Sequence, residues 1–149
     1  MGITKLNLPP VALHASTQMD NRTFEKVKFL EEAGFRQIVL ARVLSLDEIR
    51  DIAMQTSVPI EVFVHGALCV SYSGQCYLSH ALSGRSANRG ECAQYCRLPY
   101  DLVDAEGVKI VSNKHLLSPK DMNFSDQLED LLEAGCSSLK TEGQLKDVS

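Results

Sequence analysis

The chain has 149 residues, of which 44% are hydrophobic and 23% charged, and its net charge at pH 7 is −4. This length suits one domain with its own core, and the negative charge excludes a surface that binds nucleic acid everywhere. No run reaches the roughly 18 apolar residues of a membrane span. Residues 1–10 contain no apolar signal-peptide core, so we expect a cytoplasmic protein with no membrane contact.

Short apolar runs alternate along the chain with segments of helical spacing. Ser45 is placed as a helix N-cap, and Gly34 and Gly135 are placed as the residues that end two helices. In chain order we expect strand 11–15, helix 23–33, strand 37–41, helix 45–54, strand 59–64, helix 125–134 and strand 137–141. This alternation predicts an α/β fold with a parallel sheet and crossover helices.

The expected elements provide about four strands, whereas a complete TIM-type barrel takes about 250 residues. We therefore expect residues 1–149 to be a fragment, a parallel (β/α) half of such a barrel. Residues 66–122 interrupt the pattern as a long loop insertion, rich in cysteine and arginine and with little periodicity. Such a loop is usually functional, and it follows the end of a strand where β/α folds place their sites.

Half a barrel would leave two open sheet edges, at its first and last strands. Open edges offer unpaired backbone groups to another chain, and an exposed apolar face favours association with a second molecule. The residues expected to face water are Val39, Val62, Val64 and Leu139. We therefore predict a homo-oligomer that buries the strand edges.

Four of the five cysteines lie within the 66–122 segment, at Cys69, Cys76, Cys92 and Cys96. In a reducing compartment such a cluster indicates metal or redox use rather than disulfides. The spacing lacks the paired knuckles of zinc ribbons and suits a 4Fe–4S cluster better, with zinc as the alternative. A further alternative is that the four thiols bind no metal and that some of them are buried in the core. Cys136 stands apart and is expected to be a packed core residue.

Two further groups of polar residues are candidates for function. Arg85, Arg89 and Arg97 surround the cysteines, with tyrosines interleaved, and this pattern suits RNA binding or, alternatively, hydrogen bonds that hold the loop. Other polar residues follow the expected strands, where a barrel would gather them at one mouth. As a set they are candidates for proton transfer or anion binding: His14, Gln18, Arg42, His65, Lys140 and Glu142.

The segments 61–69 (Glu-Val-Phe-Val-His-Gly-Ala-Leu-Cys) and 72–79 (Tyr-Ser-Gly-Gln-Cys-Tyr-Leu-Ser) resemble the signature of the collagenase-like peptidase family, peptidase U-32. The segments 88–97 and 139–143 resemble two later blocks of the family, and 14–18 resembles an upstream strand. The matches follow the family's order across nearly the whole chain. One departure is Gln144, where the family usually has arginine.

This resemblance implies a β/α barrel of which the second half is present here. It implies a 4Fe–4S cluster on Cys69, Cys76, Cys92 and Cys96. The likeness is closest to the branch that hydroxylates a cytidine in large-subunit ribosomal RNA, and a sister branch makes 5-hydroxyuridine in transfer RNA. The full-length protein would then act on RNA, and the fragment alone would be inactive.

Two other hypotheses about function remain beside the RNA hydroxylase. The family name implies a collagenase-like protease, which is a hydrolase, but the sequence offers no recognisable nucleophile–base pair or zinc–water site for it. The third hypothesis is that the chain is a binding fragment without catalytic activity.

Overall fold

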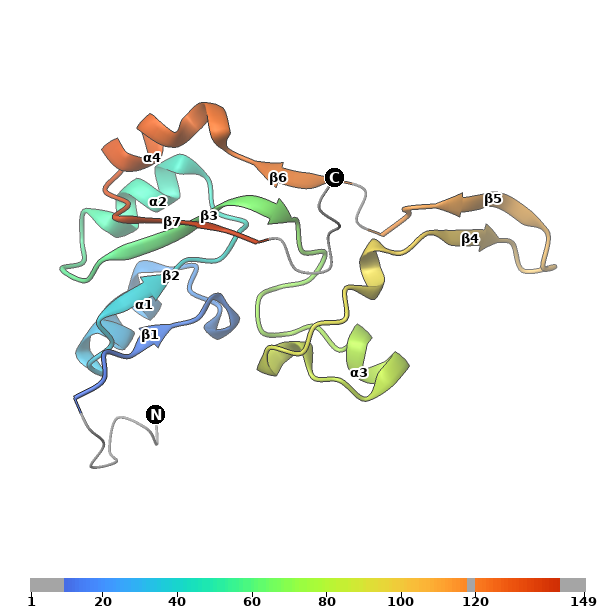
Figure 1. Cartoon of the computed structure of the whole chain (residues 1–149), viewed down its shortest axis with the longest axis horizontal. Helices are drawn as coiled ribbons and strands as arrows, with labels where there is room; N and C mark the ends of the chain where they lie inside the picture. Colours follow the sequence, from blue (N-terminus) through green and yellow to red (C-terminus); the bar gives the residue numbers. More distant parts are fainter. Residues whose placement is uncertain (1–9, 118–119, 143–149) are drawn as a thin grey trace.

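The structure is a computed structural model that describes residues 10–117 and 120–142. A sheet in the order β1–β2–β3–β6, with β7 also paired to β3, forms its main body (Figure 1). The strands are β1 (His14–Ala15), β2 (Gln37–Val39), β3 (Ile60–Ala67), β6 (Asp121–Asn123) and β7 (Ser138–Thr141). The helices are α1 (Phe24–Glu32), α2 (Leu46–Ala53), α3 (Leu78–Ser83) and α4 (Leu128–Glu133), and β4 (Tyr100–Val103) pairs with β5 (Lys109–Lys114) in a separate hairpin.

Four strands of the main sheet are parallel, because β1 pairs with β2, β2 with β3 and β3 with β7 in the same direction. These are the four strands that the sequence predicts. The structure adds β6, which runs antiparallel to the last residues of β3. Within the described residues the sheet is open, with β1 and β7 at its edges, so the half barrel stays a prediction.

Helices α1 and α2 begin at the caps that their sequences provide. The Thr23 side chain accepts a hydrogen bond from the Lys26 backbone N–H at the start of α1. At the start of α2 the Ser45 side chain accepts from the Glu48 N–H, and the Glu48 carboxylate accepts from the Ser45 N–H at 2.8 Å. This capping box satisfies two N–H groups that the helix leaves unpaired. The hydrogen bonds that the Glu48 carboxylate accepts, first from the Ser45 N–H and then from the Ser45 hydroxyl, lower the pKa of this carboxylate.

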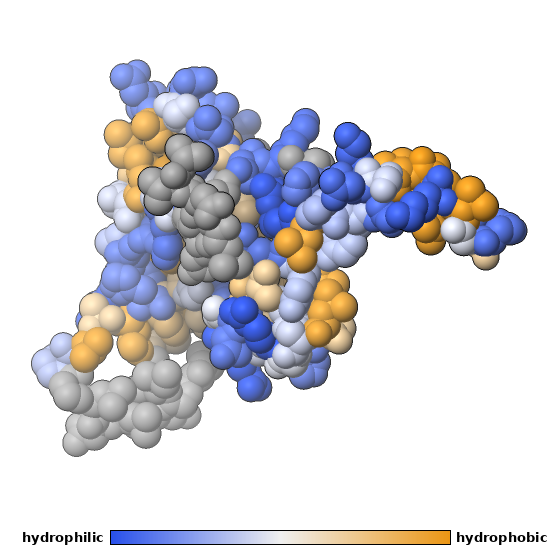
Figure 2. All heavy atoms as spheres, turned by 45° about the vertical axis from the view of Figure 1, so that its right-hand side comes forward, coloured by the Kyte–Doolittle hydropathy of each residue, from blue (hydrophilic) through white to orange (hydrophobic). Residues whose placement is uncertain are grey.

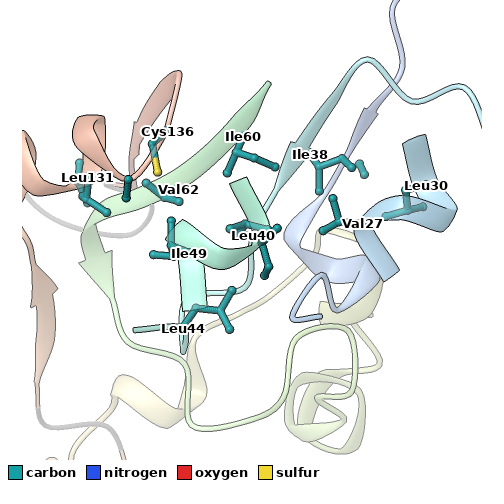
Figure 3. Packing of buried hydrophobic residues seen from close by; sticks show 14 residues of the cluster. Val27, Leu30, Ile38, Leu40, Leu44, Ile49, Ile60, Val62, Leu131 and Cys136 are labelled. Atoms are coloured by element: carbon teal, nitrogen blue, oxygen red, sulfur yellow. The ribbon is translucent and has the colours of Figure 1, made fainter. Parts of the chain in front are cut away.

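One face of the sheet packs against α1, α2 and α4 (Figure 3). The helices contribute buried side chains such as Leu30, Ile49 and Leu131, and the sheet contributes Ile38 and Ile60. Burial of this apolar surface is the main favourable term in folding. The three helices therefore leave the opposite face of the sheet available for a functional site.

The expectation of a water-exposed inner face is wrong for Val39, Val62 and Val64, which are 6%, 4% and 8% exposed. Val62 and Val64 belong to the core beneath the helices, because successive side chains of a strand point to opposite faces. Val39 packs with Phe63 and Met122 on the other face. Leu139 is 37% exposed.

The segment 66–122 is also more ordered than the sequence predicts. It contains α3, the β4–β5 hairpin, the start of β6 and short 3₁₀ turns. The hairpin turn is held by Asp104, whose carboxylate accepts from the N–H of Val108 at 2.8 Å. The hairpin extends away from the sheet (Figure 1) and carries exposed apolar side chains, among them Val108 and Ile110. Figure 2 shows an orange, apolar surface along this hairpin.

No helix within the described residues is long and apolar enough to cross a membrane. The departure at Gln144 and the chain beyond the last strand, 143–149, lie outside the described residues.

Candidate functional site

A cavity of about 460 Å³ lies at the carboxyl ends of the parallel strands. Its walls come from the segment after β1, from the sheet face opposite the helices, and from the cysteine segment, by which we mean residues 68–97. Five of the six polar residues predicted at strand ends line it: His14, Gln18, Arg42, Lys140 and Glu142. All four clustered cysteines line the same cavity. The structure therefore brings five of these six candidates together with the four cysteines, and their roles stay predictions.

His65 does not line the cavity, so the structure does not bring it together with the other five candidates. Its side chain is exposed and it is not among the residues that line the cavity. The sequence placed the strand end at Val64, which would make His65 the first loop residue. In the structure β3 continues to Ala67, because β6 pairs with its last three residues. His65 therefore lies within the strand.

A charged network lies over the sheet side of the cavity. The guanidinium of Arg42 lies 4.0 Å from the centre of the Phe63 ring and pairs with the Glu142 carboxylate at 2.6 Å. Its Nη1 also donates to the carbonyl of Ala67 at 2.8 Å. The ammonium of Lys140 lies 5.5 Å from the same ring. Arg42 thus ties the sheet to the chain that leads directly into the cysteine segment.

Glu61 lines the cavity, although the sequence pattern did not predict it as a site residue. Its carboxylate accepts a hydrogen bond from Gln37, lies 3.3 Å from the Lys140 ammonium and accepts from the Ser138 hydroxyl at 3.0 Å. These partners come from β2 and from β7, on either side of β3. A lone carboxylate in the otherwise apolar run 59–64 was the signal that could have identified it.

The four cysteine thiols are close enough to influence one another. Cys69 is exposed, and the other three are half-buried. The pKa of the Cys96 thiol is raised, first by burial and then by the charges of the other three cysteines. The backbone N–H of Gln94 donates to the sulfur of Cys92 at 3.4 Å. A metal that takes thiolates would have to displace the proton that Cys96 retains.

The cysteine segment packs against the 3₁₀ turn Thr17–Met19, which follows β1, and Gly74 lies at the closest approach. This glycine has a φ of +73°, and a Cβ at its position would overlap the carbonyl oxygen of Gln18. The Gln18 side chain donates to the carbonyl of Ala87 at 3.0 Å. Only glycine allows the backbone to approach this closely. The segment is thereby held over the cavity.

Internal hydrogen bonds brace the cysteine segment further. The Cys76 N–H donates to the Asn88 side chain at 2.8 Å, and the Ala93 N–H donates to the Ser79 hydroxyl at 3.1 Å. The Ser79 side chain is buried, at 2% exposure. The backbone is therefore fixed at Cys76 itself and at Ala93, the residue after Cys92.

The arginines of this segment lie in two different settings. Arg97 lines the cavity, pairs with Asp121 and donates to the carbonyl of Lys120 at 2.8 Å. Arg85 and Arg89 are exposed on the outside and do not line the cavity. Cys136 is 5% exposed, and burial raises the pKa of its thiol to about 11. Its predicted place in the core is confirmed.

The donor set in the cavity is compatible with a 4Fe–4S cluster. In the described ranges, no three His, Cys, Asp or Glu side chains are grouped tightly enough to hold a single metal ion. A 4Fe–4S cube is larger than one ion, and each of its irons takes one protein thiolate. Four thiols around one cavity match the ligand number of a 4Fe–4S cluster and also that of a four-cysteine zinc site.

The chain is similar to several known proteins. The chain is 59% identical over its whole length to the 23S rRNA 5-hydroxycytidine C2501 synthase of Escherichia coli, of which it covers 23%. It is 38% identical to tRNA hydroxylation protein P1 of Bacillus subtilis and 36% identical to a collagenase of Porphyromonas gingivalis, with 94% and 91% of the chain aligned. It spans 35% and 36% of these two relatives.

No solved structure matches the chain. The model of peptidase family U32 matches residues 1–149. The chain therefore belongs to peptidase family U32.

Proposed function

We propose that this chain forms the cluster-binding part of a cytoplasmic enzyme that hydroxylates a nucleobase in RNA, with a cytidine of large-subunit ribosomal RNA as its first candidate substrate. The observation that carries this proposal is one cavity that joins four cysteines to polar side chains at the strand ends. The names of the ribosomal RNA and transfer RNA relatives support the choice of substrate.

The thiols of Cys69, Cys76, Cys92 and Cys96 would hold a 4Fe–4S cluster, with zinc as the alternative. The cluster would supply one-electron chemistry, and its potential depends on hydrogen bonds to its sulfurs. The bond from the Gln94 N–H to the Cys92 sulfur is a contact of this kind.

The other cavity residues would bind and orient the base. His14 lines the cavity and carries a ring whose two nitrogens can donate or accept hydrogen bonds with the base. The half-exposed ammonium of Lys140 faces the same space, where it can bind an oxygen of the base or of its phosphate. Arg42, held by Glu142 and Phe63, would keep the site's geometry fixed rather than contact substrate.

Mass spectrometry of ribosomal and transfer RNA tests this function. Cells that lack the gene containing this chain should lose one hydroxylated nucleoside, and the wild-type gene should restore it. A gene with Cys76→Ser should not restore it. RNA that is unchanged by loss of the gene would refute the proposal.

A collagenase-like protease is the second candidate, because one relative at 36% identity is named a collagenase. The metal-free gene product would then cleave gelatin. Gelatin cleavage together with unchanged RNA would establish this alternative in place of the first.

Arg85 and Arg89 are candidates for phosphate contacts, because both are exposed on the cysteine segment, outside the cavity. For each of Arg85→Ala and Arg89→Ala we expect weaker RNA binding and a salt slope lower by about one unit. Arg36→Ala is the matched control, since Arg36 is an exposed arginine before β2, at the opposite end of the strands. Binding titrations at several salt concentrations measure the slopes. Equal slopes for all three variants would show that Arg85 and Arg89 do not touch phosphate.

We also propose that the 149-residue chain by itself forms a homo-oligomer. Within the described residues β1 and β7 each pair along one side only, and the hairpin carries exposed apolar side chains. Open edges and apolar patches favour association. Light scattering at micromolar concentration should give at least twice the mass of 16.4 kDa for one chain. A stable monomer would contradict this prediction.

A further inference from the structure

One aromatic side chain of the cysteine segment stands at the cavity instead of in the core. Tyr72 lies between Cys69 and Cys76, its side chain is 60% exposed, and it lines the cavity. Its carbonyl accepts from the N–H of Gln75 at 3.1 Å, which closes a turn. The backbone that carries the ring is therefore fixed.

The ring itself is braced by a cation. The guanidinium carbon of Arg22 lies 4.5 Å from the centre of the Tyr72 ring. Arg22 is in turn held by Asp20 through two contacts, Nε to Oδ1 at 2.7 Å and Nη2 to Oδ2 at 2.9 Å. A cation over an aromatic face is attractive, and a two-pronged pair to a carboxylate sets its orientation. Asp20, Arg22 and Tyr72 thus form a stack prepared before any ligand arrives.

An exposed tyrosine does not by itself indicate a binding site. A tyrosine ring that is fixed at a cavity can bind a flat ligand by stacking. An enzyme that modifies a base must take the base out of its stack and into a pocket, where aromatic side chains stack against it. The cavity volume of about 460 Å³ lies within the range of small-molecule sites, roughly 300–1,000 Å³. A side chain that is already ordered loses little freedom on binding.

We propose that Tyr72 is the stacking platform for the nucleobase that enters the cavity, and that Arg22 and Asp20 are the positioning residues that hold its ring. This inference rests on the proposed function and adds the contact that receives the base. His14 and Lys140 line the same cavity and provide polar partners for the edges of the stacked base.

The test is a binding cycle with the complete gene product that contains this chain. The probe is a short RNA hairpin with a single cytidine in its loop, beside the same hairpin with an abasic site at that position. Tyr72→Ala should bind the cytidine hairpin about ten-fold more weakly than wild type, the range for loss of one base–aromatic stack. It should bind the abasic hairpin as wild type does.

Two variants complete the design. Tyr72→Phe keeps the ring and should bind like wild type. Tyr77→Ala removes a tyrosine of similar exposure, 69%, that does not line the cavity, and it should also bind like wild type. Thermal unfolding of each variant shows whether the fold is retained.

The possible outcomes distinguish a failure of the stacking role of Tyr72 from a failure of the proposed RNA hydroxylation. Equal losses of Tyr72→Ala on both hairpins, or no loss on either, would overturn the stacking role while RNA hydroxylation in cells remained. A wild-type protein that binds neither hairpin and changes no RNA nucleoside would overturn the proposed function as well.

Discussion

Cys76→Ser in the gene product that contains this chain, purified without oxygen, is expected to abolish iron binding and the brown colour of a thiolate-bound cluster. The reason is that Cys76 is one of four thiols around a single cavity, and its backbone is fixed by the Asn88 side chain. A serine hydroxyl is a much poorer ligand for iron than a thiolate. Iron and sulfide analysis, together with the visible spectrum, measures the loss.

Cys136→Ala is the matched control for this experiment. Cys136 is the fifth cysteine, buried in the core away from the cavity, and its thiol has a pKa raised to about 11. The control should keep its iron in full and lose only a little stability, through the small cavity left in the core. A wild-type protein that is colourless and holds one zinc per chain would contradict the assignment of iron.

Gly74→Ala is expected to lower the free energy of unfolding by about 2–4 kcal/mol, from left-handed backbone strain and from the clash of the new Cβ. The φ of +73° disfavours any side chain, and the Cβ would overlap the carbonyl oxygen of Gln18. Because the clash would push the cysteine segment away from the turn that follows β1, the thiol of Cys76 should also react faster with an alkylating reagent. Denaturant unfolding and mass spectrometry of the alkylated protein measure both effects.

Gly84→Ala separates the two causes. Gly84 ends α3 with an almost equal φ of +72°, but a Cβ there would meet nothing within 4 Å. This variant should lose only about 1 kcal/mol, the cost of the backbone strain alone. Equal losses for the two variants would mean that the approach of Gly74 to Gln18 contributes nothing to stability.

The sequence by itself determined the elements whose signals are local. The cap at Ser45, the glycine after α1 and the apolar runs predicted helices and parallel strands at nearly their observed places. The grouping of the cysteines, and of polar residues at strand ends, also predicted which side chains would gather, because parallel strands bring their carboxyl ends to one edge. His14, Arg42 and Lys140 therefore meet the cysteines as expected.

The tertiary structure alone decided what depends on pairing between distant residues. The pairing of β6 extends β3 to Ala67 and so keeps His65 within the strand. Contacts among three strands make Glu61 part of the cavity.

The brace of Arg22 on Tyr72 was likewise invisible in the sequence, because it joins residues that are 50 positions apart. Spacing along a chain shows which side chains share a face of one element. It does not show which loop folds over that face, since that choice depends on long-range packing and on a close approach such as that of Gly74 to Gln18.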